Sequence, residues 1–261
     1  MAAHFGNLEK VVNGKRTYSI TPHIPGGFIR PEQLAKIAEV AEKYNATIKF
    51  TSGQRLLIGR LKEEDIPAVW EELGMEPAVT SQNSVKNVEI CPAAMCKRSK
   101  HNTIRIGMKL SRMYQRAEMP CRTKIGVAGC RNACGSAYSK DIGVIADIDG
   151  SLIVTAGGSS GFNPRLADII DRSLDEKGVF KLVESIVEFY RAEAEVGEKL
   201  GHFIDRIGLD EFRKNVVEEG RLDIINQPTP EELAIEAGKR AQEEFERRQA
   251  EAKAKEEAEN K

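Results

Sequence analysis

Two pairs of cysteines constrain this chain more than any other feature of its sequence. Cys91 and Cys96 have four residues between them, and Cys130 and Cys134 have three. The gap between the pairs has room for one helix and one strand. Thiolates are soft ligands that suit iron–sulfur clusters and zinc. The spacing leaves three alternatives open: an iron–sulfur cluster, a zinc site, and four unrelated buried cysteines that pack as small hydrophobes.

The residues around the cysteines favour a cluster over the other two alternatives. Pro92 follows the first cysteine directly, and Gly129 and Gly135 flank the second pair. Glycine allows the backbone to pass close to a bulky group. A fifth cysteine, Cys121, lies apart from both pairs, and a structural role fits it better than a redox role. Five cysteines outside a disulfide framework indicate metal or redox chemistry.

The overall charge excludes some classes of partner. The formal net charge is -1, so the chain carries no general basic signature for nucleic acid. Any anion-binding function must therefore come from a local group of cations. The first seven residues lack the pattern of a signal peptide, and no window approaches the roughly 18 apolar residues of a membrane span. These features predict a cytoplasmic protein with no membrane span.

Hydrophobic periodicity predicts an α+β fold. The first part reads as a helix from Pro31, strands at 47–50 and 55–59, and a helix from about Glu63. The second part reads as a helix at about 101–116, strands at 124–128, 141–146 and 152–156, and helices at about 164–173, 178–200 and 209–218. After Pro228, residues 229–261 read as a charged helical tail, which is either a solvated helix or a partner-binding helix. The expected domains are 1–80, 81–220 and 221–261.

Several motifs, taken together, resemble the nitrite and sulfite reductase family. The segments 85–92 and 129–134, followed by Asp141-Ile142-Gly143, resemble its sirohaem-binding half. Pro25-Gly26-Gly27 and the loop 51–55 resemble its ferredoxin-like half-domain. The resemblance covers about residues 18–215. It implies a ferredoxin-like half-domain, then a half-domain that binds sirohaem and a 4Fe–4S cluster, and then the C-terminal helical tail.

The resemblance also implies cofactor ligands. Cys91, Cys96, Cys130 and Cys134 would bind the 4Fe–4S cluster, and the Cys134 sulfur would also be the axial ligand of the sirohaem iron. Sirohaem carries eight carboxylates, so its site needs many cations. The cations beside the cysteine pairs are Lys97, Arg98, Lys100, Arg105, Lys109, Arg112, Arg116, Arg122, Lys124 and Arg131. The residues expected to bind the cofactors besides the cysteines are Arg55, Arg98, Arg131 and Asn132.

By position in the family, the residues that face the substrate would be Lys86, Arg122 and Lys124. Arg122 and Lys124 are two residues apart, so on a strand their side chains point to one face. They would polarise bonds of the bound anion and help to deliver protons. The implied activity is the six-electron reduction of sulfite to sulfide, with nitrite reduction to ammonia as the related reaction. These catalytic assignments follow from the resemblance and not from spacing alone.

Three departures from the family pattern stand out. The first cysteine spacing is one residue shorter than the common one. Thr21 and His23 stand before Pro25, where the family often has an arginine, and His23 is either its replacement or a surface histidine. Lys86 stands where an arginine is usual, and lysine cannot grip an anion with two parallel hydrogen bonds.

The chain also has fewer copies of the paired half-domains than many members of the family it resembles. It has one copy of the paired half-domains, so a homodimer is expected to restore the twofold symmetry that two copies give other members. No flavin or nicotinamide fingerprint is present, so electrons would come from a separate donor protein. The alternatives are an iron–sulfur electron carrier without a catalytic haem, and a zinc-stabilised binding protein.

Overall fold

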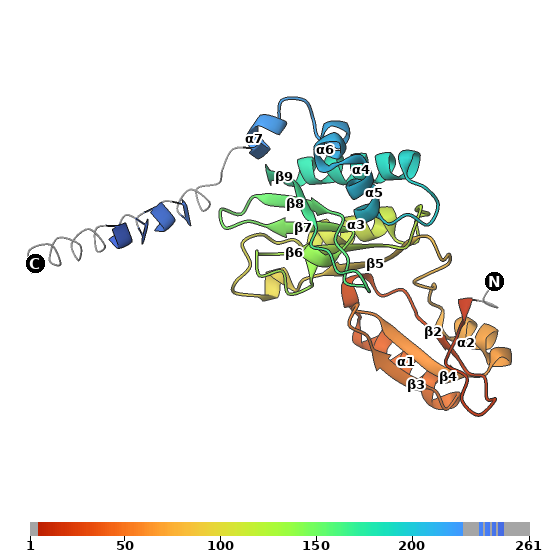
Figure 1. Cartoon of the computed structure of the whole chain (residues 1–261). Coiled ribbons are helices and arrows are strands. Elements are labelled where there is room, and N and C mark those ends of the chain that lie inside the picture. Colours follow the sequence, from red (N-terminus) through yellow and green to blue (C-terminus); the bar gives the residue numbers. More distant parts are fainter. Residues whose placement is uncertain (1–4, 227–234, 237, 241, 244, 248–261) are drawn as a thin grey trace, which may run out of the picture. The chain divides into compact units, whose positions relative to one another are not determined.

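The computed structural model describes residues 5–226, 235–236, 238–240, 242–243 and 245–247 (Figure 1). The chain divides into two units, Met1–Val217 and Glu218–Lys261. In the second unit, α7 spans Leu222–Asn226, and the described residues between 235 and 247 are helical. The rest of the predicted tail lies outside the described residues.

The first half of the larger unit is an antiparallel sheet covered by two helices. Its strands pair in the order β1-β2-β4-β3. The strands are β1 (Asn7–Leu8), β2 (Tyr18–Ile20), β3 (Thr47–Phe50) and β4 (Leu56–Leu61). The helices are α1 (Pro31–Lys43) and α2 (Ile66–Leu73), and the short 3₁₀ turns are η2 (Pro25–Gly27) and η3 (Glu63–Asp65). Apolar residues of both helices pack on the sheet around Ile37, Ile58 and Ile66, which are fully buried.

The second half is a mixed five-stranded sheet with strand order β5-β6-β7-β8-β9. Its strands are β5 (Val85–Ile90), β6 (Thr123–Ala128), β7 (Ile142–Ala146), β8 (Leu152–Ala156) and β9 (Asp168–Leu174). The first three strands are parallel, and the last two are antiparallel to their neighbours. Strands β7 and β8 are buried along their whole length, as expected for a sheet covered on both faces.

Helices and short turns complete the second half. The helices are α3 (Ile104–Tyr114), α4 (Glu176–Glu193), α5 (Leu200–Ile207) and α6 (Leu209–Val216), and the 3₁₀ turns are η4 (Ala93–Met95) and η5 (Ala137–Ser139). Helix α3 connects β5 to β6, the crossover that parallel strands require. The Lys109 ammonium of α3 lies 3.8 Å from the centre of the Phe180 ring of α4. These two helices are therefore neighbours, as they are in Figure 1.

The α+β prediction is confirmed, with one element of the wrong type. Residues 164–173 were expected to be helical, but 168–174 form β9, which pairs with β8. Ile170 and Leu174 on this strand are buried. Pairing with a buried neighbouring strand outweighs the local helical pattern of these residues, because propensity is weaker than tertiary packing. The predicted helix 178–200 also divides, since α4 ends at Glu193 and α5 begins at Leu200.

The two halves of the larger unit are joined by polar contacts to β5. The Gln54 side chain donates to the Ile90 carbonyl (2.9 Å) and accepts from the Ile90 N–H (2.8 Å), as a neighbouring strand would. The Asn87 amide donates to the Gly53 carbonyl. Gly26 has φ +58°, and a Cβ there would lie 2.5 Å from Ile90 Cδ1, so this close approach requires glycine. The family-like motifs of the first half therefore hold β5, the strand that directly precedes Cys91.

Within the described residues, no helix combines the length and the apolar character needed to cross a membrane.

Candidate functional site

The four paired cysteines gather at the carboxyl ends of two parallel strands. Cys91 directly follows β5, and its N–H donates to the Val127 carbonyl of β6 (2.9 Å). Cys96 ends the short turn η4, and Cys130 follows β6 after Gly129. Because the carboxyl ends of parallel strands meet at one edge of a sheet, the fold alone brings the two pairs together. The four residues are named the thiol group below.

The thiols of this group differ in exposure. Cys91 is buried, Cys96 and Cys130 are half-buried, and Cys134 is exposed. Burial is the largest cause that raises the pKa of the Cys91 thiol, and the Gly129 N–H opposes this. The other three thiols raise this pKa further, which shows that all four lie within electrostatic range. Cys134 is thus the most exposed residue of the thiol group.

The loop between Cys130 and Cys134 is held in a conformation that ordinary residues rarely adopt. Ala133 has φ +43°, and its N–H donates to the Cys130 carbonyl (3.1 Å). The Asn132 amide donates to the Cys134 sulfur (3.0 Å). Positive φ at a non-glycine residue costs free energy and often marks a functional loop. Asn132, expected near the cofactor, therefore contacts the thiol group directly.

The thiol group offers four sulfur ligands. In the described part of the chain, no group of three or more Cys, His, Asp or Glu side chains is arranged to hold a single metal ion. Four thiols that lie at one edge of the sheet and share an electrostatic environment are the ligand type of an iron–sulfur cluster.

A group of four cations gathers beside the same strands. Lys86, Arg122 and Lys124 lie at the amino ends of β5 and β6, and Arg55 comes from the loop of the first half that contacts β5. The four residues are named the cation group below. Burial is the main cause that lowers the pKa of Arg55, Lys86 and Lys124, and repulsion by the Arg122 guanidinium lowers all three further. Like charges this close are unfavourable without an anion nearby. The arrangement is therefore prepared to bind one.

Arg55 joins this group through the contacts between the two halves of the unit. It directly follows Gly53 and Gln54, which form hydrogen bonds with β5. Its Nε is buried and has no hydrogen-bond partner. Such an unpaired buried donor is rare in proteins and calls for a ligand or water. By contrast, the Lys86 ammonium donates to the Ser81 carbonyl (2.5 Å).

A buried ion pair lies beside the cation group, and sequence reasoning missed both of its members. The Lys140 ammonium lies 2.7 Å from a Glu89 carboxylate oxygen, and their side chains are 8% and 4% exposed. The Glu89 carboxylate also acts on Arg55 and Lys124, whose pKa values it raises against the other causes. Glu89 is thus the negative charge that balances part of the cation group. Only the pairing of β5 with β6 and β7 brings it to Lys140.

Breaking this pair is expected to destabilise the fold. Lys140→Met should lower the free energy of unfolding by about 3–5 kcal/mol, because the Glu89 carboxylate would remain buried without a partner. The double variant Glu89→Gln with Lys140→Met should lose less than the sum of the two single variants. Urea unfolding of each protein measures this. Lys36→Met, which removes an exposed ion pair with Glu39, is the control and should leave the midpoint unchanged. A midpoint for Lys140→Met equal to that of the control would contradict the expectation.

The other predicted cations are distributed differently. Arg98 is exposed on the loop that follows Cys96, within the same part of the chain as the thiol group. Arg131 pairs with Asp147, with Nε 2.6 Å from Oδ1. Away from the strand ends, Arg105 pairs with Glu176 (2.7 Å). Arg98 thus stays a candidate for a cofactor carboxylate, whereas the charge of Arg131 is already compensated by a carboxylate.

His23 and Cys121 occupy separate places. The His23 N–H donates to the Glu76 carbonyl (2.8 Å), and burial is the main cause that lowers the pKa of its imidazole. Arg116, which pairs with Glu76 (2.6 Å), lowers this pKa further. Cys121 is half-buried and directly precedes Arg122. It lies at the cation end of β6, away from the thiol group.

The predicted site residues thus form two groups and not one. The thiol group lies at the carboxyl ends of β5 and β6, whereas Lys86, Arg122 and Lys124 of the cation group lie at their amino ends. Lys86 is five residues before Cys91, and Lys124 is six before Cys130. At about 3.3 Å per residue, these intervals correspond to roughly 16–20 Å of extended strand.

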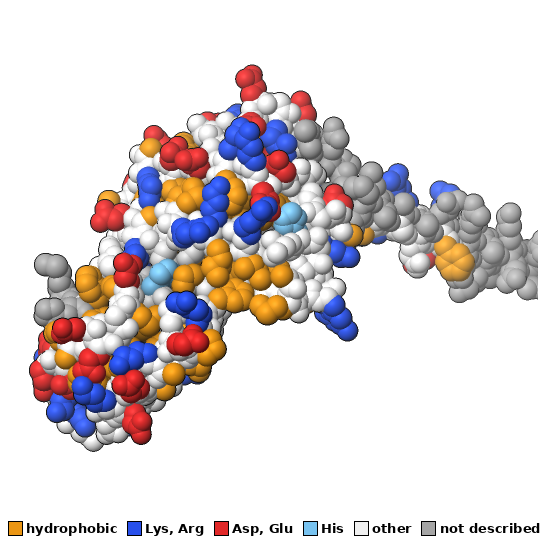
Figure 2. Space-filling model, turned by 180° about the vertical axis from the view of Figure 1, so that it is seen from behind, with side chains coloured by type: hydrophobic (Ala, Val, Ile, Leu, Met, Phe, Trp, Pro, Cys, Tyr) orange, Lys and Arg blue, Asp and Glu red, His pale blue; other side chains and the backbone are white. Residues whose placement is uncertain are grey.

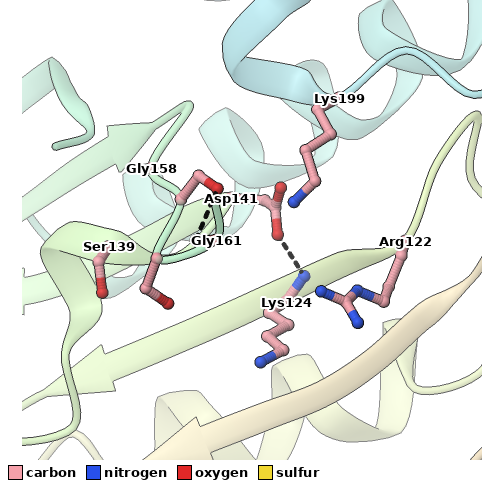
Figure 3. A pocket seen from close by; sticks show the side chains of 9 residues that line it. Arg122, Lys124, Ser139, Asp141, Gly158, Gly161 and Lys199 are labelled. Atoms are coloured by element: carbon pink, nitrogen blue, oxygen red, sulfur yellow. Dashed lines mark hydrogen bonds between the residues drawn. The ribbon is translucent and has the colours of Figure 1, made fainter. Parts of the chain in front are cut away.

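A small pocket opens beside the cation group. It has a volume of about 100 Å³. Arg122 and Lys124 line it, together with Asp141 before β7 and Lys199 before α5 (Figure 3). The Asp141 carboxylate accepts a hydrogen bond from the Lys124 N–H (2.8 Å), and burial raises its pKa. The face drawn in Figure 2 carries side chains of both signs of charge, in keeping with the near-neutral chain.

Comparisons with known proteins agree with this architecture. Residues 81–223 match the family model described as the nitrite and sulphite reductase 4Fe-4S domain. Residues 11–76 match the nitrite/sulfite reductase ferredoxin-like half domain. The matched segments correspond to the two sheets and to the joint between them.

Individual proteins show the same relationship. An assimilatory-type sulfite reductase of Nitratidesulfovibrio vulgaris is 31% identical over 205 residues, which is 78% of this chain and 94% of that protein. A nitrite reductase [NAD(P)H] of Bacillus subtilis is 27% identical over 84% of this chain, which spans only 27% of that protein.

Solved structures share the fold at low identity. The Mycobacterium tuberculosis NirA protein aligns with a TM-score of 0.66 at 18% identity, over 79% of this chain and 40% of that one. Dissimilatory sulfite reductase I aligns with a TM-score of 0.67 at 13% identity, over 82% of this chain and 72% of that one. From both family models and the sulfite reductase relative, this chain belongs to the nitrite and sulfite reductase family of oxidoreductases, with the 4Fe–4S domain of that family.

Proposed function

We propose that this protein is a sirohaem-dependent reductase that converts sulfite to sulfide, with nitrite as a second substrate. The cation group is the observation that carries the proposal, because a small anion is the ligand that relieves its internal repulsion. The identity to an assimilatory-type sulfite reductase over nearly the whole length of that protein favours sulfite.

The residues present fit both cofactors. The thiol group offers four sulfurs for a 4Fe–4S cluster, and the exposed Cys134 can also ligate a haem iron. The unpaired Nε of Arg55 and the exposed Arg98 suit the carboxylates of sirohaem. When bound, sirohaem would supply an iron that holds the anion and passes electrons to it.

The protein's own part is to bind the anion and to supply protons. Arg122 is a permanent cation that neutralises the substrate charge. Lys86 and Lys124 have lowered pKa values, so their ammonium groups release protons more readily than an ordinary lysine. Loss of oxygen from sulfite consumes protons, and these two residues are placed to deliver them.

The separation between the cation group and the thiol group further supports a site shared between two copies of this chain. In one chain Lys86, Arg122 and Lys124 lie at the opposite ends of β5 and β6 from the thiol group. A symmetric dimer would bring the cations of one copy to the exposed Cys134 of the other, and the same contact would occur twice. Each of the two sites would then combine residues of both copies.

Mixing two inactive variants tests this arrangement. Lys124→Met and Cys134→Ser chains, co-expressed and purified together, should recover roughly a quarter of wild-type sulfite reduction. Random pairing makes half of the dimers mixed, and each mixed dimer has one intact site. Each variant alone should stay inactive. Mixed dimers with no recovered activity would place the whole site within one chain.

The visible spectrum of the purified protein separates this function from the alternatives. Sirohaem gives a Soret band and long-wavelength bands, a cluster alone gives a broad brown absorbance, and zinc gives neither. A cluster spectrum without haem bands would replace the reductase with an electron carrier. We also infer a separate electron-donor protein, and a cytoplasmic location, where free thiols such as these persist.

A further inference from the structure

The pocket beside the cation group contains a cation that no family motif identifies. Lys199 immediately precedes α5, far along the chain from β6, yet it lines the same pocket as Arg122 and Lys124 (Figure 3). Among the described residues, no hydrogen bond or direct ion pair engages its ammonium group. Its one recorded interaction is electrostatic: it lowers the pKa of the Asp141 carboxyl, which burial raises.

The charges of the pocket favour an anion. Arg122, Lys124 and Lys199 contribute three cations, and Asp141 is the one carboxylate among the lining residues. Even with Asp141 ionised, an excess of two positive charges remains. Asp141 is 5% exposed and its carboxylate accepts the Lys124 N–H (2.8 Å), so one of its oxygens is already held by the backbone of β6.

The opposite wall is a backbone loop that is fixed in place. A Cβ on Gly158 would lie 2.5 Å from the Lys140 carbonyl oxygen, so the loop passes this close only as glycine. Beyond it, Ser159 and Arg165 exchange two backbone hydrogen bonds of 2.8 Å. The Arg165 guanidinium pairs with Asp168 and Asp205, so its charge is compensated. Lys199 is therefore the additional cation available to a ligand in this pocket.

The pocket has space for a small ligand. Its volume of about 100 Å³ is enough for several water molecules, and a sulfite or nitrite ion fits this space.

We propose that Lys199 binds the substrate oxyanion together with Arg122 and Lys124, as a third cation of the substrate pocket. This inference rests on the proposed reduction of sulfite. Lys199 comes from the helical segment that follows the second sheet. The segment therefore contributes to the site and is not only a cover for the sheet.

A lysine substitution with matched controls tests this role. In holoprotein Lys199→Met, the Kd for sodium sulfite, measured by calorimetry, should rise about tenfold or more, as expected for the loss of one charge-assisted hydrogen bond. The KM for sulfite should rise in parallel, with kcat changed less than about threefold. Lys199→Arg should restore most of the affinity, because it keeps the charge. Lys177→Met, which removes an exposed lysine outside the pocket, should match the wild type.

A second variant does not depend on Lys199. Ser160 lines the pocket and is exposed, so Ser160→Asp adds a negative charge with little risk to folding. It should weaken sulfite binding in the same direction. Unchanged Kd in both Lys199→Met and Ser160→Asp would overturn the proposal. Loss of sirohaem with unchanged sulfite affinity would also overturn it, because the pocket would then hold a cofactor carboxylate.

The calorimetric Kd for sulfite distinguishes failure of the Lys199 proposal from failure of the proposed reductase function. If the wild type reduces neither anion but binds sulfite in a Lys199-dependent way, the reductase proposal fails and the pocket stands. If the wild type reduces sulfite and Lys199→Met does so with unchanged KM and Kd, the pocket assignment fails alone.

Discussion

A Cys130→Ser variant is expected to lose its iron–sulfur cluster, and much of the protein should become insoluble. Cys91 and Cys96 should behave in the same way. The thiol group joins the ends of β5 and β6 to the turn η4 and to the strained loop at Ala133, so cluster binding and local folding are coupled. Serine keeps the size of the side chain but is a poor ligand for iron.

Iron and acid-labile sulfide per chain measure the loss. We expect about four irons fewer per chain, together with the disappearance of the broad visible absorbance. Cys121→Ser is the matched control, since Cys121 is a half-buried cysteine of the same chain outside the thiol group. It should keep the full cluster content. A normal cluster spectrum in the variants of Cys91, Cys96 and Cys130 would refute the ligand assignment.

A Lys124→Met variant is expected to keep both cofactors and to lose sulfite turnover by roughly 10²-fold or more. That is the scale of removing one preorganised electrostatic group from a reaction centre. Methionine keeps much of the bulk of lysine but has no charge and no proton. Burial and the neighbouring Lys140 lower the pKa of Lys124, so the variant also loses a proton donor suited to this step.

Steady-state sulfite reduction with an artificial electron donor measures the effect, beside spectra that report the cofactors. Electron uptake by the cofactors should continue, because Lys124 lies at the opposite end of β6 from the thiol group. Lys177→Met controls for the loss of a lysine and should turn over normally. Wild-type rates in Lys124→Met with both anions would remove Lys124 from the site.

The chemistry of the thiol group could be predicted from the order and spacing of residues alone. The spacing and context of Cys91, Cys96, Cys130 and Cys134 indicated a cluster, and the surrounding motifs indicated the family, which both family models confirm. The sequence also predicted strands such as β6, since local patterns of apolar residues reveal elements that lie within one segment. The residue roles and the domain boundaries remain predictions.

Contacts between charged side chains depend on the fold. The pairing of β5, β6 and β7 brings Glu89 to Lys140, and the position of α5 brings Lys199 to Arg122. Strand β9 likewise depends on its neighbour β8, against the helical signal of its own residues. The parallel direction of β5 and β6 separates the cation group from the thiol group by the length of a strand. Spacing along the chain is a local property, whereas these contacts depend on the order and direction of strands in a sheet, which short-range patterns do not encode.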